Sequence, residues 1–265
     1  MRTAALLVAV LAFALYAPGS GARFSNTAES QEALVVWEMT ESGDWVLPRV
    51  NGELIPSKPP LYHWIALGFS ALRGGVDEAA VRLPSIVFGA AAVGLVFAAG
   101  AAEWGLVAAT AASVVLATSP EWVKWATTAR TDTTFAFFLS AAFFLGHRWL
   151  RTGESRVLWL LAAATGAATL AKGFAAAALV GLVLAIETWR RGAWSRYRPG
   201  ALVVAAVIFC AVAGGWYAAA LVQGGFAFFQ KQIILENVLR FFPSEGGGPS
   251  RQHSVFFYVP MLFVG

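Results

Sequence analysis

Long apolar segments separated by short polar connections make up most of the chain. Seven of them are candidate membrane-spanning helices, at 3–16, 83–101, 105–119, 133–145, 157–170, 174–186 and 201–221. A further apolar run occupies 255–265 and stops with the chain. Because a transmembrane helix needs about 20 residues, we expect this run to be a helix cut short. The pattern predicts an all-α, polytopic membrane helix bundle, a single transmembrane domain over 1–265 that is truncated at its C-terminus.

Arginines between the apolar segments predict how the helices are oriented. They cluster in two short connections, at Arg148, Arg151 and Arg156, and at Arg190, Arg191, Arg196 and Arg198. Short basic loops face the cytoplasm. Counting helices from these loops then places 17–82, 121–132, 171–173 and 222–254 together on the extracytoplasmic side.

The first outer segment, 17–82, contains two predicted helices. Residues 29–40 form an amphipathic pattern, with Ala33, Val36, Trp37 and Thr40 opposite three glutamates, and the glycine at 43 is typical of a helix end. A second helix is predicted over 61–72, after a proline pair. Its Tyr62, His63 and Trp64 suit a membrane interface. We expect this helix to lie in the interface rather than to cross, which is the alternative.

Composition agrees with a membrane protein and excludes several other classes. The chain is 58% hydrophobic and 13% charged, with a mean hydropathy of +0.65 and a net charge of +4. Soluble domains carry about 25% charged residues. The basic residues form no stripe with interleaved aromatics, which argues against nucleic-acid binding. Cys210 is the single cysteine, and we expect it to be a small hydrophobic residue of the core. Residues 3–16 are expected to be a retained signal anchor, because Pro18 disfavours cleavage.

Cations on the predicted outer side point to an anionic ligand. Lys58 precedes two prolines, and Lys172 interrupts a nearly continuous apolar run. Each has a simpler explanation, since Lys58 could only extend to the interface and Lys172 could belong to a tight outer turn. An ionisable residue within or beside a membrane-spanning segment is nevertheless a functional candidate.

Carboxylates accompany these cations. Asp132 begins a predicted span, where it could cap the helix, and Arg130 could pair with it or face a polar cavity. Glu29 and Glu32 are one helical turn apart and share a face, which could equally be a solvated surface. The remaining cavity candidates belong to the last outer segment: Glu236, Asn237, Arg240, Arg251 and His253.

One ordered set of motifs resembles a known family. The chain contains EM at 38–39, SGDWVLPRVNGE at 42–53, KPPL at 58–61 and RLPS at 82–85. Shorter matches follow in the same order: TSP at 118–120, TD at 131–132, LAKG at 170–173, WY at 216–217, EN at 236–237, RF at 240–241 and FYVP at 257–260. Together they resemble the N-terminal portion of the lipid A aminoarabinose transferase and protein O-mannosyltransferase superfamily, which are GT-C glycosyltransferases.

The resemblance implies transfer of a sugar from a polyprenyl-phosphate donor to an unknown extracytoplasmic acceptor (lipid, glycan or protein) at a bacterial inner membrane. Lys58 would bind the donor phosphate, with Lys172, Arg240 and Arg251 behind it. Preplaced cations stabilise the leaving phosphate, and a carboxylate would activate the acceptor.

Two positions depart from the family pattern. Ala28 occupies the place of the supposed catalytic aspartate, which leaves Glu29 or Asp132 as the acidic candidates. Ser57 stands where the family has an acidic residue before Lys58. The sequence therefore predicts no particular cofactor, and a divalent metal, although possible, would lack its usual acidic ligand at this position. The competing interpretations are a lipid or solute transporter, which would show inverted repeats, and a catalytically inactive relative.

Overall fold

The computed structural model describes residues 2–54 and 58–239, and most of them lie in helices. The first half contains α1 (Arg2–Tyr16), α2 (Thr27–Ser42), a hairpin of β1 (Arg49–Val50) and β2 (Glu53–Leu54), α3 (Leu61–Arg73), α4 (Glu78–Glu103) and α5 (Gly105–Thr118). The second half contains α6 (Pro120–Ala126), α7 (Asp132–Thr152), α8 (Ser155–Lys172), α9 (Ala175–Arg191), η1 (Ala193–Arg196), α10 (Pro199–Phe209), η2 (Cys210–Gly214), α11 (Gly215–Phe228) and η3 (Phe229–Leu239). The predicted all-α membrane bundle is confirmed.

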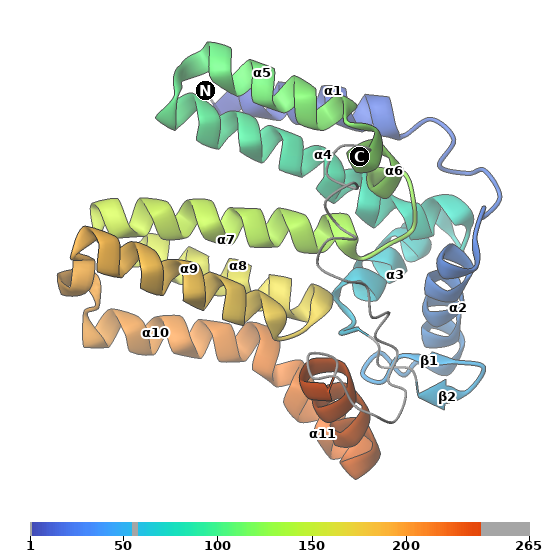
Figure 1. Ribbon diagram of the computed structural model, residues 1–265. Coiled ribbons are helices and arrows are strands. Elements are labelled where there is room, and N and C mark those ends of the chain that lie inside the picture. The colour runs from blue at the N-terminus through green and yellow to red at the C-terminus, as the bar shows by residue number, and fades with distance from the viewer. Residues whose placement is uncertain (1, 55–57, 240–265) are drawn as a thin grey trace.

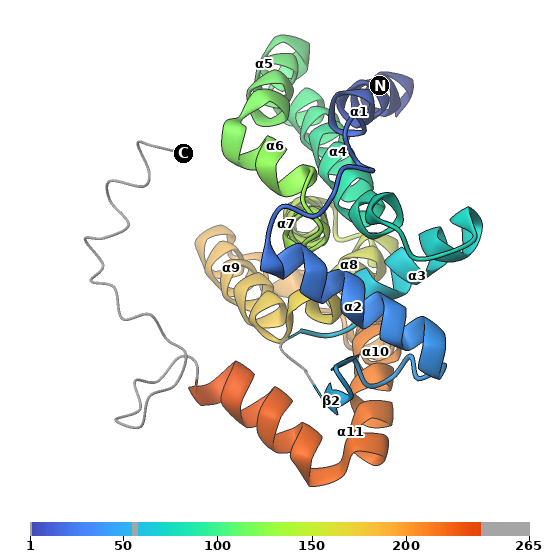
Figure 2. The same ribbon diagram turned by 90° about the vertical axis from the view of Figure 1, so that its right-hand side faces the viewer.

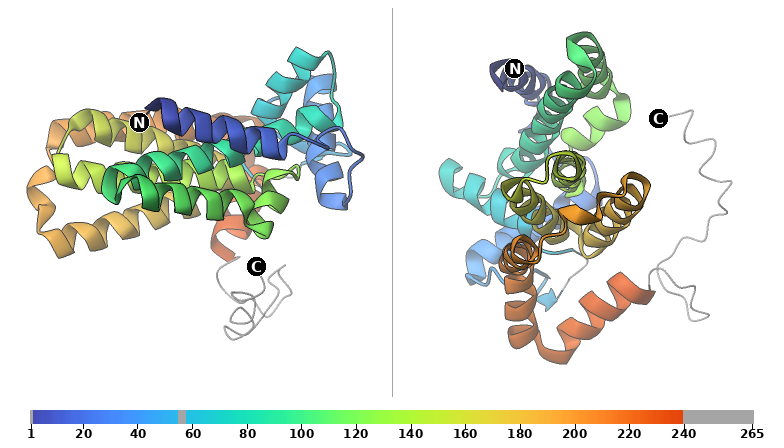
Figure 3. Two further views of the ribbon diagram at one scale, coloured as in Figure 1. Left: turned by 90° about the horizontal axis from the view of Figure 1, so that it is seen from above. Right: turned by 90° about the vertical axis from the view of Figure 1, so that its left-hand side faces the viewer.

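The bundle is formed by helices that run side by side, namely α1, α4, α5, α7, α8, α9 and α10 (Figure 1; Figure 3, left). Helices α1, α4 and α5 make one group, and α7, α8, α9 and α10 make the other, joined where α4 packs on α7. Small residues allow close approach: a Cβ at Gly94 would lie 2.9 Å from the Ala5 carbonyl oxygen of α1, and one at Gly100 would lie 3.2 Å from the Ala109 Cα. Such contacts are typical of helix packing in membranes.

Among the described residues, two helical segments have the length and apolarity of a membrane span, or three if a bent pair is counted as one span. Glu78–Glu103 and Pro199–Glu236 qualify alone, and Gly105–Thr118 with Pro120–Ala126 qualifies as a pair bent by 65°. The other bundle helices are shorter or more polar, but they run alongside these (Figure 1). Cys210 differs from our expectation of a core position, because it is exposed on the bundle surface.

The two ends of the bundle differ in chemistry. One end, on the left of Figure 1 and facing the viewer in Figure 3, right, carries the α7–α8 and α9–α10 connections with their arginine clusters. The opposite end gathers α2, the hairpin, α3, α6 and the α8–α9 connection. The described residues of 17–82, 121–132 and 171–173, three of the four segments predicted to share the outer side, therefore lie together, while 240–254 of the fourth segment lie outside the described residues.

Helix α2 crosses the ends of the bundle helices rather than following them (Figure 2). It begins where the Asn26 side chain accepts a hydrogen bond from the Glu29 amide at 3.0 Å and ends at Gly43, whose φ of 68° suits glycine. Helix α3 begins directly after Pro60, as predicted, and packs on α2 and α4. The outer end thus has its own framework, fixed to α4.

The short β-hairpin was not predicted. Its turn, Asn51-Gly52, has positive φ angles of 55° and 74°, which is the geometry that Asn-Gly pairs favour. The Glu38 carboxylate accepts hydrogen bonds from the amides of both turn residues. The hairpin is therefore tied to α2.

The prediction of which face of α2 is buried is wrong. Glu29 and Glu32, expected opposite the apolar face, are buried together with Val36, whereas Trp37 is 50% exposed. Helical periodicity assumes that carboxylates prefer water, but a buried carboxylate is stable when partners with positive charge surround it.

Candidate active site

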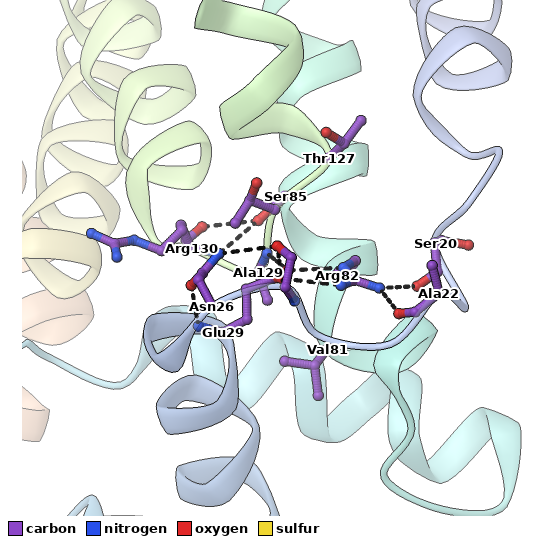
Figure 4. Close-up of polar contacts among 12 residues, drawn as sticks. Ser20, Ala22, Asn26, Glu29, Val81, Arg82, Ser85, Thr127, Ala129 and Arg130 are labelled. Carbon is purple, nitrogen blue, oxygen red and sulfur yellow. Dashed lines mark hydrogen bonds and ion pairs between the residues drawn. The ribbon is translucent and has the colours of Figure 1, made fainter.

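Glu29 lies in the first turn of α2 and is held by a buried arginine of α4 (Figure 4). The Arg82 Nε donates to Oε1 at 2.8 Å, and its Nη2 donates to Oε2 at 3.1 Å. The Ala129 amide also donates to Oε1 at 2.9 Å, and the Ser25 amide and hydroxyl donate to Oε2 at 3.1 and 3.2 Å. Both carboxylate oxygens are therefore fully engaged.

Arg82 organises the chain around this pair. Its guanidinium donates to the carbonyls of Ser20 (2.8 Å) and Ala22, which fixes the segment between α1 and α2. One turn along α4, the Ser85 hydroxyl donates to the Arg130 carbonyl at 2.9 Å. The same hydroxyl accepts from the Arg130 amide at 3.2 Å (Figure 4). This network places the start of α7, and hence Asp132, relative to α2.

The Glu29 carboxyl is strongly acidic in the folded protein. Burial alone would raise its pKa, but the Arg82 guanidinium and the amides of Ala129 and Ser25 outweigh burial and lower the pKa to about 2. A carboxylate in this state is a poor proton acceptor, so the geometry favours a structural role for Glu29.

We expect the pairing of Glu29 to make stability depend on pH. The folded-state pKa is about 2 and the ordinary value is 4.5, so the stabilisation is complete above about pH 4.5 and disappears as the pH falls toward 2. Thermal unfolding in detergent between pH 6 and pH 2 should show falling stability below pH 4.5. E29Q should give a shallower dependence over that range, and an unchanged slope would contradict the assignment.

A second cluster joins α2 to the start of α3. The Lys58 Nζ donates to Glu32 Oε1 at 2.9 Å, and the other oxygen, Oε2, lies 2.7 Å from His63 Nε2. Burial would raise the pKa of the Glu32 carboxyl, but His63 and Lys58 together lower it to about 2. His63 is 3% exposed. The prediction of an interfacial His63 is therefore wrong, because the ring is needed inside to satisfy Glu32.

A third cluster forms where α7 begins and α8 ends. Asp132 Oδ1 accepts from the Lys172 Nζ at 2.7 Å, and Oδ2 lies 3.4 Å from the Arg130 Nε. Lys172 and then Lys58 are the strongest cationic influences on the Asp132 carboxylate. The Lys58 and Asp132 clusters are consequently electrostatically coupled.

Within the two coupled clusters, cations outnumber carboxylates by one. Three permanent cations, Lys58, Lys172 and Arg130, face the carboxylates of Glu32 and Asp132. Lys58, Lys172 and Arg130 keep 20%, 39% and 28% of their side chains exposed, so a ligand can reach them. This arrangement can bind an anion such as a phosphate and can present a carboxylate beside it.

The structure therefore brings together six of the predicted residues: Glu32, Lys58, Arg130, Asp132 and Lys172 in the coupled clusters, with Glu29 beside them. Glu236 lies on η3, which packs against α11. The side chain of Asn237 and all of Arg240, Arg251, His253 and Ser57 lie outside the described residues. Within 2–54 and 58–239, no three His, Cys, Asp or Glu side chains are grouped as metal ligands.

Arg82 and His63 are the two site residues whose roles the sequence did not reveal. Arg82 begins a long apolar segment, and a charge there signals a buried partner. The only sequence signal for His63 is its position five residues after Lys58. Neither signal identifies a glutamate on α2 as the partner, because each pair is separated by at least 31 positions in the chain.

Comparison with solved structures identifies the same fold. The chain resembles ArnT from Cupriavidus metallidurans bound to undecaprenyl phosphate, with 25% identity and a TM-score of 0.81. The match covers 98% of this chain and 47% of that one. The apo state of the same protein matches with a TM-score of 0.80 at 24% identity, also over 98% and 47% of the two chains. This chain thus spans about half the length of these structures.

Sequence comparison gives the family. An uncharacterised protein of Aquifex aeolicus is 27% identical over 137 residues, which is 51% of this chain and 27% of that protein. The family model described as dolichyl-phosphate-mannose-protein mannosyltransferase matches residues 57–217. That match includes Lys58, Asp132 and Lys172 and covers more than half of the chain, so the chain belongs to the dolichyl-phosphate-mannose-protein mannosyltransferase family.

Proposed function

We propose that the protein is a membrane glycosyltransferase that moves a sugar from a polyprenyl-phosphate-linked donor to a lipid, glycan or protein acceptor. The observation that carries the proposal is the coupled site, where Lys58, Lys172 and Arg130 face Glu32 and Asp132. The family match and the likeness to a protein bound to undecaprenyl phosphate support the nature of the donor.

The proposed chemistry is a direct displacement that inverts the anomeric carbon. The acceptor atom bonds to that carbon while the bond from the carbon to the phosphate oxygen breaks, and the electron pair leaves with the phosphate. Lys58 and Lys172 stabilise the charge that develops there, because preplaced cations act most strongly where charge appears. A carboxylate of the site takes the proton of the acceptor.

The location of the site also supports this assignment. The coupled clusters lie at the bundle end opposite the arginine-rich connections (Figure 1). By the positive-inside rule we infer that this end faces away from the cytoplasm, which would be the periplasmic side of a bacterial inner membrane. A lipid donor and a membrane-associated acceptor can both reach it from the bilayer, which concentrates and orients them.

The test compares membranes that contain the full-length protein with membranes from a deletion strain. Isotopically labelled polyprenyl-phosphate-linked sugar is expected to yield free polyprenyl phosphate and a glycosylated acceptor only when the protein is present. Equal donor consumption in both membranes would refute the enzyme and would favour an inactive relative that binds or assembles with other proteins.

A further inference from the structure

The carboxylates of the candidate site differ in what touches them. Glu29 accepts five hydrogen bonds, two of them from a buried arginine. Asp132 contacts the two permanent cations Lys172 and Arg130. Glu32 differs from Asp132 because it contacts only one permanent cation, Lys58. Its remaining contact is His63, a ring that can be neutral.

Glu32 is held from one side and can be released from the other. His63 is buried, and its Nδ1 has no hydrogen-bond partner among the described residues. An unpaired acceptor is tolerated in the interior better than an unpaired N–H, which favours the tautomer that donates from Nε2 to Glu32 Oε2. His63 then fixes the carboxylate, while Oε1 is bound only by the mobile ammonium of Lys58.

On the basis of the proposed function, we propose that the donor phosphate takes Lys58 away from Glu32, and that Glu32 Oε1, freed in this way, is the base that accepts the acceptor's proton. His63 is the positioning residue that keeps Glu32 in place during this exchange. The acceptor oxygen or nitrogen bonds to the anomeric carbon, the electron pair of the broken bond leaves on the phosphate, and the proton moves to Glu32.

Electrostatics explain why the exchange would regulate the reaction. While Lys58 is bound, the Glu32 carboxyl has a pKa of about 2 and is a weak base. Losing that cation raises the pKa, because a nearby opposite charge is removed from a buried carboxylate. The base therefore becomes effective only after the donor is bound, which protects the acceptor site from unproductive proton transfer.

The experiment combines binding with turnover for the full-length protein. Undecaprenyl phosphate is titrated into nanodiscs that contain the wild type, E32Q or the control E41Q, which changes an exposed glutamate of the same helix. E32Q should bind this lipid as tightly as the wild type or up to about tenfold more tightly, because Lys58 loses a competing charged hydrogen bond. Its kcat for donor consumption in native membranes should fall by about 10²- to 10⁴-fold, and E41Q should match the wild type in both measurements.

Variants of His63 separate positioning from mere packing. H63F fills the space without a donor, so it should lower kcat and leave lipid binding unchanged. H63Q restores an N–H near the position of Nε2 and should recover much of the lost kcat. A glutamate that only supports the fold would instead give E32Q with weakened lipid binding or with normal kcat, and either result would overturn the proposal.

The outcome also distinguishes this proposal from the function on which it rests. If the wild type consumes donor and E32Q does so equally well, the transferase stands and the role of Glu32 fails. If the wild type neither binds undecaprenyl phosphate nor consumes donor, both fail together.

Discussion

K58M is expected to reduce donor consumption by about 100- to 1,000-fold, the usual cost of removing one charge-stabilising contact from a transition state. Lys58 is the cation nearest to Glu32, at 2.9 Å, and its charge also helps to lower the pKa of Asp132. Methionine keeps the length and apolar stem of lysine but removes the charge. The measurement is the initial rate of polyprenyl phosphate release in membranes with equal amounts of inserted protein.

K124M provides the matched control for this prediction. Lys124 lies on α6 at the same end of the bundle, is 58% exposed and pairs with Glu121 on its own helix, so its loss should leave the rate unchanged. A wild-type rate for K58M, or an equal loss in K124M, would show that Lys58 has no specific role with phosphate.

The second large effect is on stability, and it comes from R82M. Removing the arginine leaves the Glu29 carboxylate buried beside an apolar side chain, and breaking a buried ion pair in this way costs about 3–5 kcal/mol. The side chains of Arg82 and Glu29 are only 5% and 1% exposed, so water does not screen the loss. The unfolding temperature of purified protein in detergent should fall markedly.

Two comparisons make this prediction specific. R73M breaks the pair of Arg73 with Asp77, whose side chains are 44% and 42% exposed. It should leave the unfolding temperature nearly unchanged, since surface pairs contribute little. The double variant R82M/E29M should regain part of the loss, because it leaves no unpaired charge inside. Equal unfolding temperatures for R82M and the wild type would mean that Glu29 is not held as the structure indicates.

Local chemistry made much of the outer framework predictable. Gly43 ends α2 because its φ of 68° is unfavourable for other residues, and the proline pair before Leu61 begins α3. The pairing of Arg130 with Asp132 could also be predicted, because the two residues are close in sequence. The burial of Glu29 and Glu32 on α2 could not be predicted in this way, because helical periodicity alone assigns both carboxylates to water.

The sequence by itself determined that the chain is a helical membrane bundle, which apolar segments form its helices, and which connections share one side, because apolar length, helix caps and arginine bias are local properties. Only the tertiary structure decided the partners: Arg82 for Glu29, His63 and Lys58 for Glu32, and Lys172 for Asp132. Those choices depend on which charges meet when distant helices pack, and the free energy of pairing two buried charges has no counterpart in the pattern of either segment alone.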